Sequence, residues 1–294
     1  ALNSRFELGS IYKPLTVAAA MDAGVLTPQD RFDVSAPVKI GAALVKDLHP
    51  LPNARSVTAG DILAHSSNIG TALIAQRMGV ERQKNFLRSV HLLGGQSHVG
   101  PQTASPLTPE VWDATAMATV SYGHGISVSP LAFAMTYTAF GNGGNYVSPV
   151  FVEPVDAEKV DKAQVMSPDT AAKVLGMLRE VVTRGSGKNA DAQGYEVAGK
   201  TGTAEKPGPD GYDPNKNITS FAAVFPASRP QFVVLVVLDE AQPRTGDQRT
   251  ASYTAASIAG KVIARAAPLL DVRPVLGASK VEAASLRVSE ATTP

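Results

Sequence analysis

The chain has 294 residues, of which 44% are hydrophobic and 18% charged, so it can bury a sizeable core as one large domain or two small ones. A formal net charge of +1 argues against nucleic acid as the main partner, because phosphate binding needs a concentrated basic face. There is no cysteine, which excludes disulfides, thiol catalysis and thiolate metal sites and fits an oxidising compartment. No run of about 18 apolar residues occurs, so we expect no membrane-spanning helix in this chain.

The first predicted helix begins just after a serine and a lysine. Pro14 is tolerated in a first helical turn, the alanines after it favour helix, and Gly24 is a natural stop. Ser10 and Lys13 stand three residues apart at the entrance, where positions i and i+3 share a face. One interpretation is a hydroxyl nucleophile beside a base, and the other is an N-capping serine followed by a solvated lysine.

The next helical pattern is interrupted by small polar residues. Residues 25–56 are expected to form loops and weak strands, and a helix begins at Val57. It breaks at Ser66 to Asn68 and resumes through residue 78. Serine and asparagine compete for backbone hydrogen bonds inside helices, so the break has either a capping or a functional reason.

Four more helices are predicted farther along, with the last followed by a change of composition. Ser167 and Pro168 fit an N-cap and a first helical position. After residue 267 the pattern fades into Pro, Ser, Glu and Thr, so we expect residues 268–294 to be a flexible tail. The four predicted helices are Glu81–Leu92, Pro130–Phe140, Pro168–Thr183 and Thr250–Ala267.

Three short runs rich in Val, Phe, Thr and Ala predict an antiparallel meander: Tyr195–Ala204, Ile218–Phe225 and Phe232–Leu238. A polar loop over 206–217 is expected between the first two. On the first strand Thr201 and Thr203 point to one face, and Gly202 suggests that something approaches the backbone there. The alternative is a strand at the edge of the sheet, where the charge of Lys200 would oppose pairing with another chain. Helices first, then a sheet, then a last helix indicate an α+β fold.

Three motifs now stand in order along the chain: Ser10/Lys13, Ser66/Asn68 and Lys200/Thr201/Gly202. Ser-x-x-Lys, Ser-x-Asn and Lys-Thr-Gly are the signatures of penicillin-binding proteins and active-site serine β-lactamases, which the chain resembles. The stretches 65–69, 122–131, 199–206 and 220–226 are similar to class B penicillin-binding proteins, especially the division-specific FtsI-like branch. The resemblance covers residues from about 7 to 267.

The resemblance implies a fold, an activity and a place of action. It implies a transpeptidase domain over residues 1–267, with an antiparallel sheet flanked by helices and a helical subdomain. The implied activity is peptidoglycan D,D-transpeptidation, which cross-links stem peptides at their D-Ala-D-Ala ends in septal wall synthesis and is inhibited covalently by β-lactams. No cofactor or metal is implied. A SEDS-type glycosyltransferase and other division proteins are the implied partners, at the periplasmic face of the bacterial inner membrane.

The resemblance also implies roles for the motif residues. Ser10 attacks the carbonyl of the penultimate D-Ala, and neutral Lys13 takes its proton, helped by the nearby charge of Lys200. Ser66 relays a proton to the leaving amine, and Asn68 orients Lys13 and the substrate amide.

The third motif is expected to bind the donor peptide. The hydroxyls of Thr201 and Thr203, with Lys200, would hold the terminal carboxylate beside Gly202. The backbone N–H groups of Ser10 and Thr203 would form the oxyanion hole.

The chain departs from the family in two ways. Ile11 and Tyr12 stand where the family has a small residue and phenylalanine. The family places one or two strands and a helix before the nucleophile, and this chain has nine residues there and no visible signal peptide. We therefore expect the N-terminal strands, the membrane anchor and the N-terminal module to be missing, which would leave the sheet without edge partners.

Several other functions are compatible with some of these residues. A serine β-lactamase or a D,D-carboxypeptidase would hydrolyse the same acyl-enzyme with water, and a β-lactam sensor would keep it without turnover. A Ser-His-Asp triad is disfavoured because no Gly-x-Ser-x-Gly elbow occurs. Residues 185–188 lack the full phosphate-loop pattern and are expected to form a turn. His65 and His124 are expected near the cleft or in loop caps, and Trp112 and Tyr122 in the core or a groove wall.

Overall fold

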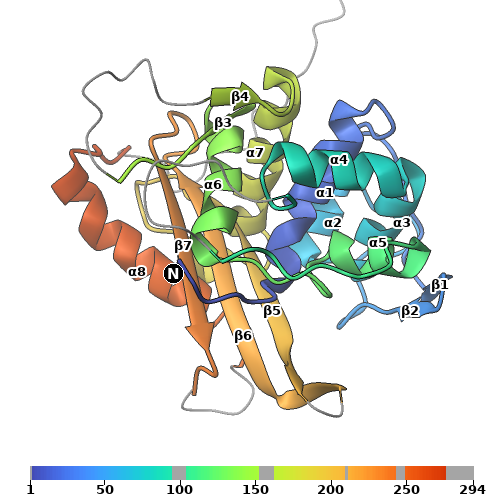
Figure 1. Ribbon diagram of the computed structural model, residues 1–294. Helices are drawn as coiled ribbons and strands as arrows, with labels where there is room; N and C mark the ends of the chain where they lie inside the picture. The colour runs from blue at the N-terminus through green and yellow to red at the C-terminus, as the bar shows by residue number, and fades with distance from the viewer. Residues whose placement is uncertain (1, 95–103, 152–161, 209–210, 243–248, 276–294) are drawn as a thin grey trace, which may run out of the picture.

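The computed structural model describes residues 2–94, 104–151, 162–208, 211–242 and 249–275, and its architecture is α+β, as predicted (Figure 1). One antiparallel sheet of three strands runs through the molecule in the order β5-β6-β7. Two small hairpins, β1–β2 and β3–β4, lie outside it. The strands are β1 (Val38–Ile40), β2 (Ala43–Val45), β3 (Asn145–Val147), β4 (Lys162–Gln164), β5 (Ala198–Gly208), β6 (Gly211–Phe225) and β7 (Phe232–Asp239).

The helices lie mainly where the sequence predicts them. They are α1 (Lys13–Asp22), α2 (Ala59–His65), α3 (Asn68–Met78), α4 (Val80–Ser89), α5 (Ala114–Ser121), α6 (Pro130–Gly141), α7 (Pro168–Thr183) and α8 (Ala255–Ala266). Helix α7 has the predicted bounds because the Ser167 hydroxyl accepts a hydrogen bond from Thr170 N at 3.2 Å and Pro168 starts the first turn. No helix among the described residues is long and apolar enough to cross a bilayer.

The sheet is buried on both faces, which gives the domain two cores. Along β7, Val233, Leu235 and Val237 pack on the larger core, formed with α1, α6 and α7. The residues between them, such as Val234 and Val236, pack on a smaller core beneath α8. In Figure 1, α8 lies on one side of the strands and α6 and α7 on the other. Burial on both faces explains why β7 is a continuous apolar run instead of an alternating one.

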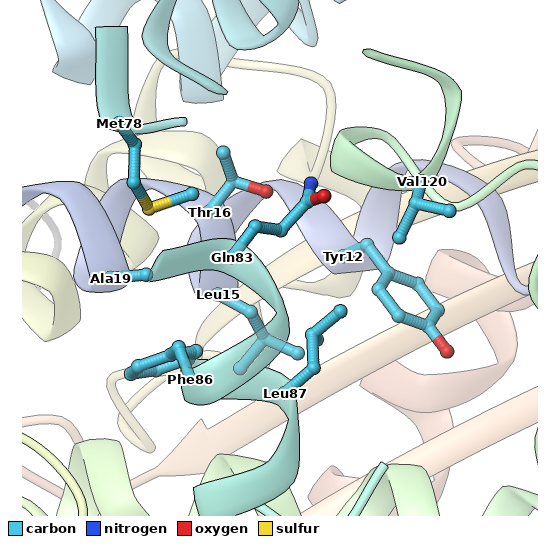
Figure 2. A pocket seen from close by; sticks show the side chains of 9 residues that line it. All are labelled: Tyr12, Leu15, Thr16, Ala19, Met78, Gln83, Phe86, Leu87 and Val120. Carbon is cyan, nitrogen blue, oxygen red and sulfur yellow. The ribbon is translucent and has the colours of Figure 1, made fainter. Parts of the chain in front are cut away.

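Helix α1 is the centre of the larger core. Every residue from Lys13 to Ala20 is buried, so the helix has no polar face. Figure 2 shows side chains of α3, α4 and α5 gathered against it, with Met78, Phe86 and Val120 around Leu15. Because α1 is enclosed on all sides, its first residues are held in fixed positions.

The predicted polar loop over 206–217 is wrong in large part. Strand β5 continues to Gly208 and β6 begins at Gly211, so the two form a long hairpin with a bulge between Glu205 and Lys206. Lys206 Nζ reaches carboxylate oxygens of Asp239 and Glu240 at 2.8 and 2.6 Å, at the end of β7. A strand that projects beyond the core needs no apolar alternation, so the sequence pattern misses it.

The C-terminal helix and the tail also differ from expectation. Helix α8 begins at Ala255 instead of Thr250, because the preceding residues turn back to the sheet and Ala251 N donates to Thr203 Oγ1 at 3.2 Å. After α8 the chain forms a 3-10 turn over Ala267–Leu270, and Val272 is only 3% exposed. The predicted boundary of the tail at 268 therefore falls too early, and residues 276–294 lie outside the described part.

Strand β7 lies at an edge of the sheet. Among the described residues it pairs with β6 alone, over eight residue pairs from Ile218↔Asp239 to Phe225↔Phe232. Its other side therefore presents backbone N–H and C=O groups that could pair with another strand. The family resemblance implies N-terminal strands, which we expect to be missing from this chain, and this stays a prediction.

Two buried tyrosines make a matched test of the core. Tyr12 OH is buried with no hydrogen-bond partner among the described residues, while Tyr137 OH donates to Ile11 O at 2.9 Å. We expect Tyr12→Phe to raise the free energy of unfolding by about 1 kcal/mol, because it removes an unsatisfied buried hydroxyl. Tyr137→Phe should lower it by about 1–2 kcal/mol, because it leaves a buried carbonyl unpaired. Urea denaturation of both variants checks this, and equal signs would contradict it.

Candidate active site

The first motif lies at the start of the central helix. A 3-10 turn over Gly9–Tyr12 carries Ser10, and α1 begins directly afterwards at Lys13. Ser10 is partly exposed, and its hydroxyl makes no hydrogen bond to another described residue. Lys13 is fully buried. The motif thus combines an accessible hydroxyl with a lysine that is held by the core.

The second motif is the break between α2 and α3. Ser66 ends α2 in the left-handed conformation, with φ 61° and ψ 41°. Ser67 then caps α3, because its hydroxyl accepts from Gly70 N at 2.9 Å, and Asn68 is the first residue of that helix. The capping explanation for the interruption is confirmed at Ser67, and its neighbours Ser66 and Asn68 contact Lys13, so a functional role for them stays a prediction.

Lys13 Nζ is the meeting point of these two motifs. It donates to the main-chain oxygen of Ser66, to Ser66 Oγ at 3.2 Å and to Asn68 Oδ1 at 2.7 Å. These three acceptors match the three N–H donors of an ammonium group. Loss of one proton frees a lone pair on the nitrogen, which can then accept a proton from a nearby hydroxyl.

The third motif lies on strand β5 of the sheet and contacts Ser66. Lys200 on β5 is fully buried, and its Nζ donates to Ser66 Oγ at 2.9 Å and to Thr201 O at 3.0 Å. Ser66 Oγ therefore accepts from two lysines, which occupies both of its lone pairs. Its own proton must point elsewhere, and it can be donated to a bound ligand.

Burial makes both lysines unusually acidic. Desolvation lowers the pKa of Lys200 to about 7. The pKa of Lys13 is held well below its usual value, first by desolvation and then by the charge of Lys200, while Asp47 acts in the opposite direction. The predicted influence of Lys200 on Lys13 is thus present, but burial is the larger cause.

Asp47 is a residue that the sequence analysis missed. It follows β2 and accepts from Ser67 Oγ at 2.7 Å, Asn68 N at 2.5 Å and Ile69 N at 3.0 Å. A carboxylate at a helix N-terminus satisfies free N–H groups and is favoured by the helix dipole. It fixes the loop that carries Ser66 and Asn68. Because Asp47 is far from α3 along the chain, no local sequence pattern identifies it as a partner of that helix.

Three glycines allow the 3-10 turn over Gly9–Tyr12 (the serine turn) to lie against the sheet. A Cβ atom on Gly202 would lie 2.3 Å from Leu8 O, and one on Gly9, where φ is +60°, would lie 2.6 Å from Thr203 O. A Cβ on Gly123, where φ is +85°, would meet Gly9 O at 2.1 Å. The close approach predicted at Gly202 is therefore made by the backbone just before Ser10.

The threonines of β5 face a polar rim beside the serine. Thr201 Oγ1 lies 2.7 Å from Ser186 Oγ, and Thr203 is exposed beside Ala251. Ser186 belongs to the predicted turn at 185–188, and the turn is present. It packs closely on α2, since a Cβ on Gly185 would lie 2.4 Å from Ala64 O. The sequence analysis did not connect this turn to the site.

The other candidate residues fall near the site or in the core. His124 is mostly buried, and desolvation and the charge of Lys13 lower its pKa to about 4, so it is neutral at physiological pH. His65 is exposed at the end of α2. Trp112 is half-buried and donates to Gln83 Oε1 at 3.0 Å. Among the described residues, no three His, Asp or Glu side chains gather where they could hold a metal ion.

The chain matches the family model for the penicillin binding protein transpeptidase domain over residues 1–264. It is 36% identical over 285 residues to "Probable peptidoglycan D,D-transpeptidase FtsI" of Caulobacter vibrioides, across 93% of this chain and 48% of that protein. It is 33% identical over 263 residues to penicillin-binding protein PbpB of Mycolicibacterium smegmatis, across 82% of this chain and 40% of that protein. The chain thus spans about half or less of the length of these relatives.

Solved structures agree with these relatives. The transpeptidase domain of Burkholderia pseudomallei penicillin-binding protein 3 superposes with a TM-score of 0.83 at 32% identity, over 93% of this chain and 82% of that one. Penicillin-binding protein 3 of Mycobacterium tuberculosis, solved with aztreonam, gives a TM-score of 0.78 at 27% identity, over 93% of this chain and 65% of that one. The resemblance carried by the three motifs is confirmed, and the chain belongs to the penicillin-binding protein transpeptidase family.

Proposed function

We propose that this chain is the catalytic domain of a peptidoglycan D,D-transpeptidase of the FtsI type. The observation that carries the proposal is the convergence of two buried lysines on Ser66 Oγ, at 3.2 Å from Lys13 and 2.9 Å from Lys200. Ser10 lies in the turn just before Lys13, and its hydroxyl makes no hydrogen bond to another described residue. Burial lowers the pKa of both lysines, that of Lys200 to about 7, and this favours the uncharged amine that a base requires.

In the proposed first step, neutral Lys13 takes the proton of Ser10, and Ser10 Oγ attacks the carbonyl carbon of the penultimate D-Ala. The oxyanion is held by backbone N–H groups of Ser10 and Thr203, a device whose loss elsewhere costs about 10²–10³ in rate. Ser66 then gives its proton to the leaving D-Ala amine and regains one from Lys13. The result is an ester on Ser10 and a free D-alanine.

The third motif supports recognition of the donor peptide. Lys200 is buried with Thr201 beside it, and the exposed hydroxyl of Thr203 lies farther along β5. Hydroxyl and ammonium donors arranged along a strand suit a terminal carboxylate. Gly202 supports the same role, because it allows the strand to lie directly against the serine turn.

In the proposed second step, an amine of another stem peptide attacks the ester and closes the cross-link, so that kinetics are ping-pong. A β-lactam mimics the D-Ala-D-Ala end and would leave a slowly hydrolysed ester on Ser10. The name of the Caulobacter vibrioides relative, a peptidoglycan D,D-transpeptidase, supports action in cell-wall synthesis, and we propose that this chain acts at division. We further propose the periplasmic face of the inner membrane as the location, with a SEDS-type glycosyltransferase and other division proteins as partners.

The competing activities differ in the fate of the acyl-enzyme. A β-lactamase or D,D-carboxypeptidase hydrolyses it, and a sensor keeps it without turnover. Asp47 is held by three donors at the start of α3, and Asp61 accepts from Arg184 at 3.0 Å, so neither is a free base for water. Neither Asp47 nor Asp61 therefore supports the hydrolytic alternatives.

The nucleophile is tested by the mass of the intact protein after incubation with a penicillin. We expect one adduct on the wild type and on Ser4→Ala, an exposed serine control, and none on Ser10→Ala. An adduct that persists for hours fits a transpeptidase or sensor, and one lost within seconds fits a β-lactamase. An adduct on Ser10→Ala would contradict the assignment.

The pH dependence of acylation tests the base. Because Lys13 must be uncharged, the acylation rate should rise with pH through the pKa of Lys13, which Asp47 raises. Asp47→Asn removes that charge, so the acid limb should move to lower pH. Its maximal rate should fall by roughly tenfold to hundredfold, because the loop carrying Ser66 is less well held.

The measurement is the second-order rate constant of penicillin acylation from acidic to alkaline pH. The control is Asp33→Asn, which neutralises an exposed carboxylate and should leave the profile in place. A shift of the acid limb to higher pH in Asp47→Asn would exclude Lys13 as the group that titrates.

A further inference from the structure

A carboxylate lies close to the nucleophile and takes no part in the steps above. Glu7 precedes Ser10 by three residues and is partly exposed. Its two oxygens accept from Tyr212 OH at 3.1 and 3.0 Å, and Gly125 N–H also donates to it. These donors hold the carboxylate in a fixed position, but none of them is a cation.

Aromatic rings connect Glu7 to the neighbourhood of Lys13. The His124 ring meets Tyr212 edge-on, with ring centroids 5.7 Å apart, and meets Tyr122 in the same way at 5.4 Å. His124 lies near enough to Lys13 for the positive charge of Lys13 to lower the pKa of the imidazole. All three rings are at least partly exposed, and Tyr212 pairs with Pro207 at the hairpin end of β5, beyond Lys200.

This group of residues has the character of a cation-binding site. Asp47 and Asp61 are already paired with donors, whereas Glu7 has no ion-pair partner among the described residues. Aromatic side chains add favourable contacts for an ammonium group. The buried Nδ1 of His124 also has no partner among the described residues, so one polar atom beside the site is unsatisfied.

We propose that Glu7, flanked by Tyr122, His124 and Tyr212, binds the ammonium group of the acceptor stem peptide. This inference rests on the proposed function, since it concerns the second substrate of the same reaction. The donor carboxylate would lie toward Lys200 and the acceptor ammonium toward Glu7. Each substrate end then meets side chains of opposite charge on its own side of Ser10.

The role includes one proton transfer. The bound R–NH₃⁺ gives a proton to the Glu7 carboxylate, and the resulting lone pair attacks the ester carbon on Ser10. The C–Oγ bond breaks, the second amine proton passes through Lys13 or Ser66 to Ser10 Oγ, and an amide remains. Glu7 then releases its proton to solvent. Burial raises the pKa of Glu7, which makes the carboxylate a better proton acceptor.

The test measures transfer and acylation on the same preparations. The donor is a thioester analogue of the D-Ala-D-Ala end, and the acceptor is D-alaninamide, whose only charge is its ammonium group. In Glu7→Gln we expect the acceptor concentration for half-maximal transfer to rise about tenfold relative to wild type, the effect of one charge-assisted hydrogen bond. Glu205→Gln, an exposed control on β5 that also removes one carboxylate charge, should match wild type.

Three outcomes would overturn the inference. The first is an unchanged half-maximal concentration in Glu7→Gln. The second is a fall in acylation by the same factor as transfer, which would mean that Glu7 only supports the serine turn. The third is an equal loss of hydrolysis without acceptor, which would make Glu7 a base for water. Failure of the proposed function is separate, because the wild type itself would then form no acyl-enzyme with penicillin, or would form one and transfer none of it to the acceptor.

Discussion

The burial of two lysine side chains around one serine is the constraint on which the rest of this structure depends. Moving an ammonium group out of water is costly, and the cost is tolerated only where hydrogen-bond acceptors replace the solvent. Here Ser66 supplies a carbonyl and a hydroxyl to Lys13, and the same hydroxyl also receives Lys200. The penalty that remains lowers the pKa of both lysines, and a lowered pKa is what a base at neutral pH needs. The chemistry of the site is therefore a direct consequence of its desolvation.

Such an arrangement requires rigid supports that meet from distant parts of the chain. Helix α1 is enclosed by the larger core, β5 belongs to a sheet covered on both faces, and the loop after α2 is held by Asp47. The glycine contacts at Gly9, Gly123 and Gly202 bring the serine turn against the sheet with no side chain between them. Because each support is fixed by packing or by hydrogen bonds, small displacements are resisted in all three motifs at once.

The charges around Ser10 are distributed unevenly, and the reaction of the family gives this distribution a meaning. Lys13 and Lys200 both donate to Ser66 Oγ, toward which the proposed donor carboxylate would lie. The carboxylate of Glu7 accepts from Tyr212 toward the hairpin end of β5, where the rings of His124 and Tyr212 meet. A transpeptidase must accept an anion at one end of the donor and an amine as the second substrate. A hydrolase needs to activate only water, so the proposed acceptor site is what would separate the two activities.

The sequence by itself determined the family, the α+β class, the three motifs and most helix bounds, because these depend on local patterns such as the Ser167 cap or on residues read in order. It could not determine what is decided between distant segments. The hairpin beyond Glu205 projects from the core and needs no apolar pattern, and the turn at 250–254 is set by a contact with Thr203. Asp47 and Ser186 join the site only through space, from a loop and a turn that carry no motif of their own, and no local pattern marks Glu7 although it precedes Ser10 by three residues. Burial is likewise a tertiary property, so only the folded chain could lower the pKa of Lys13 and Lys200.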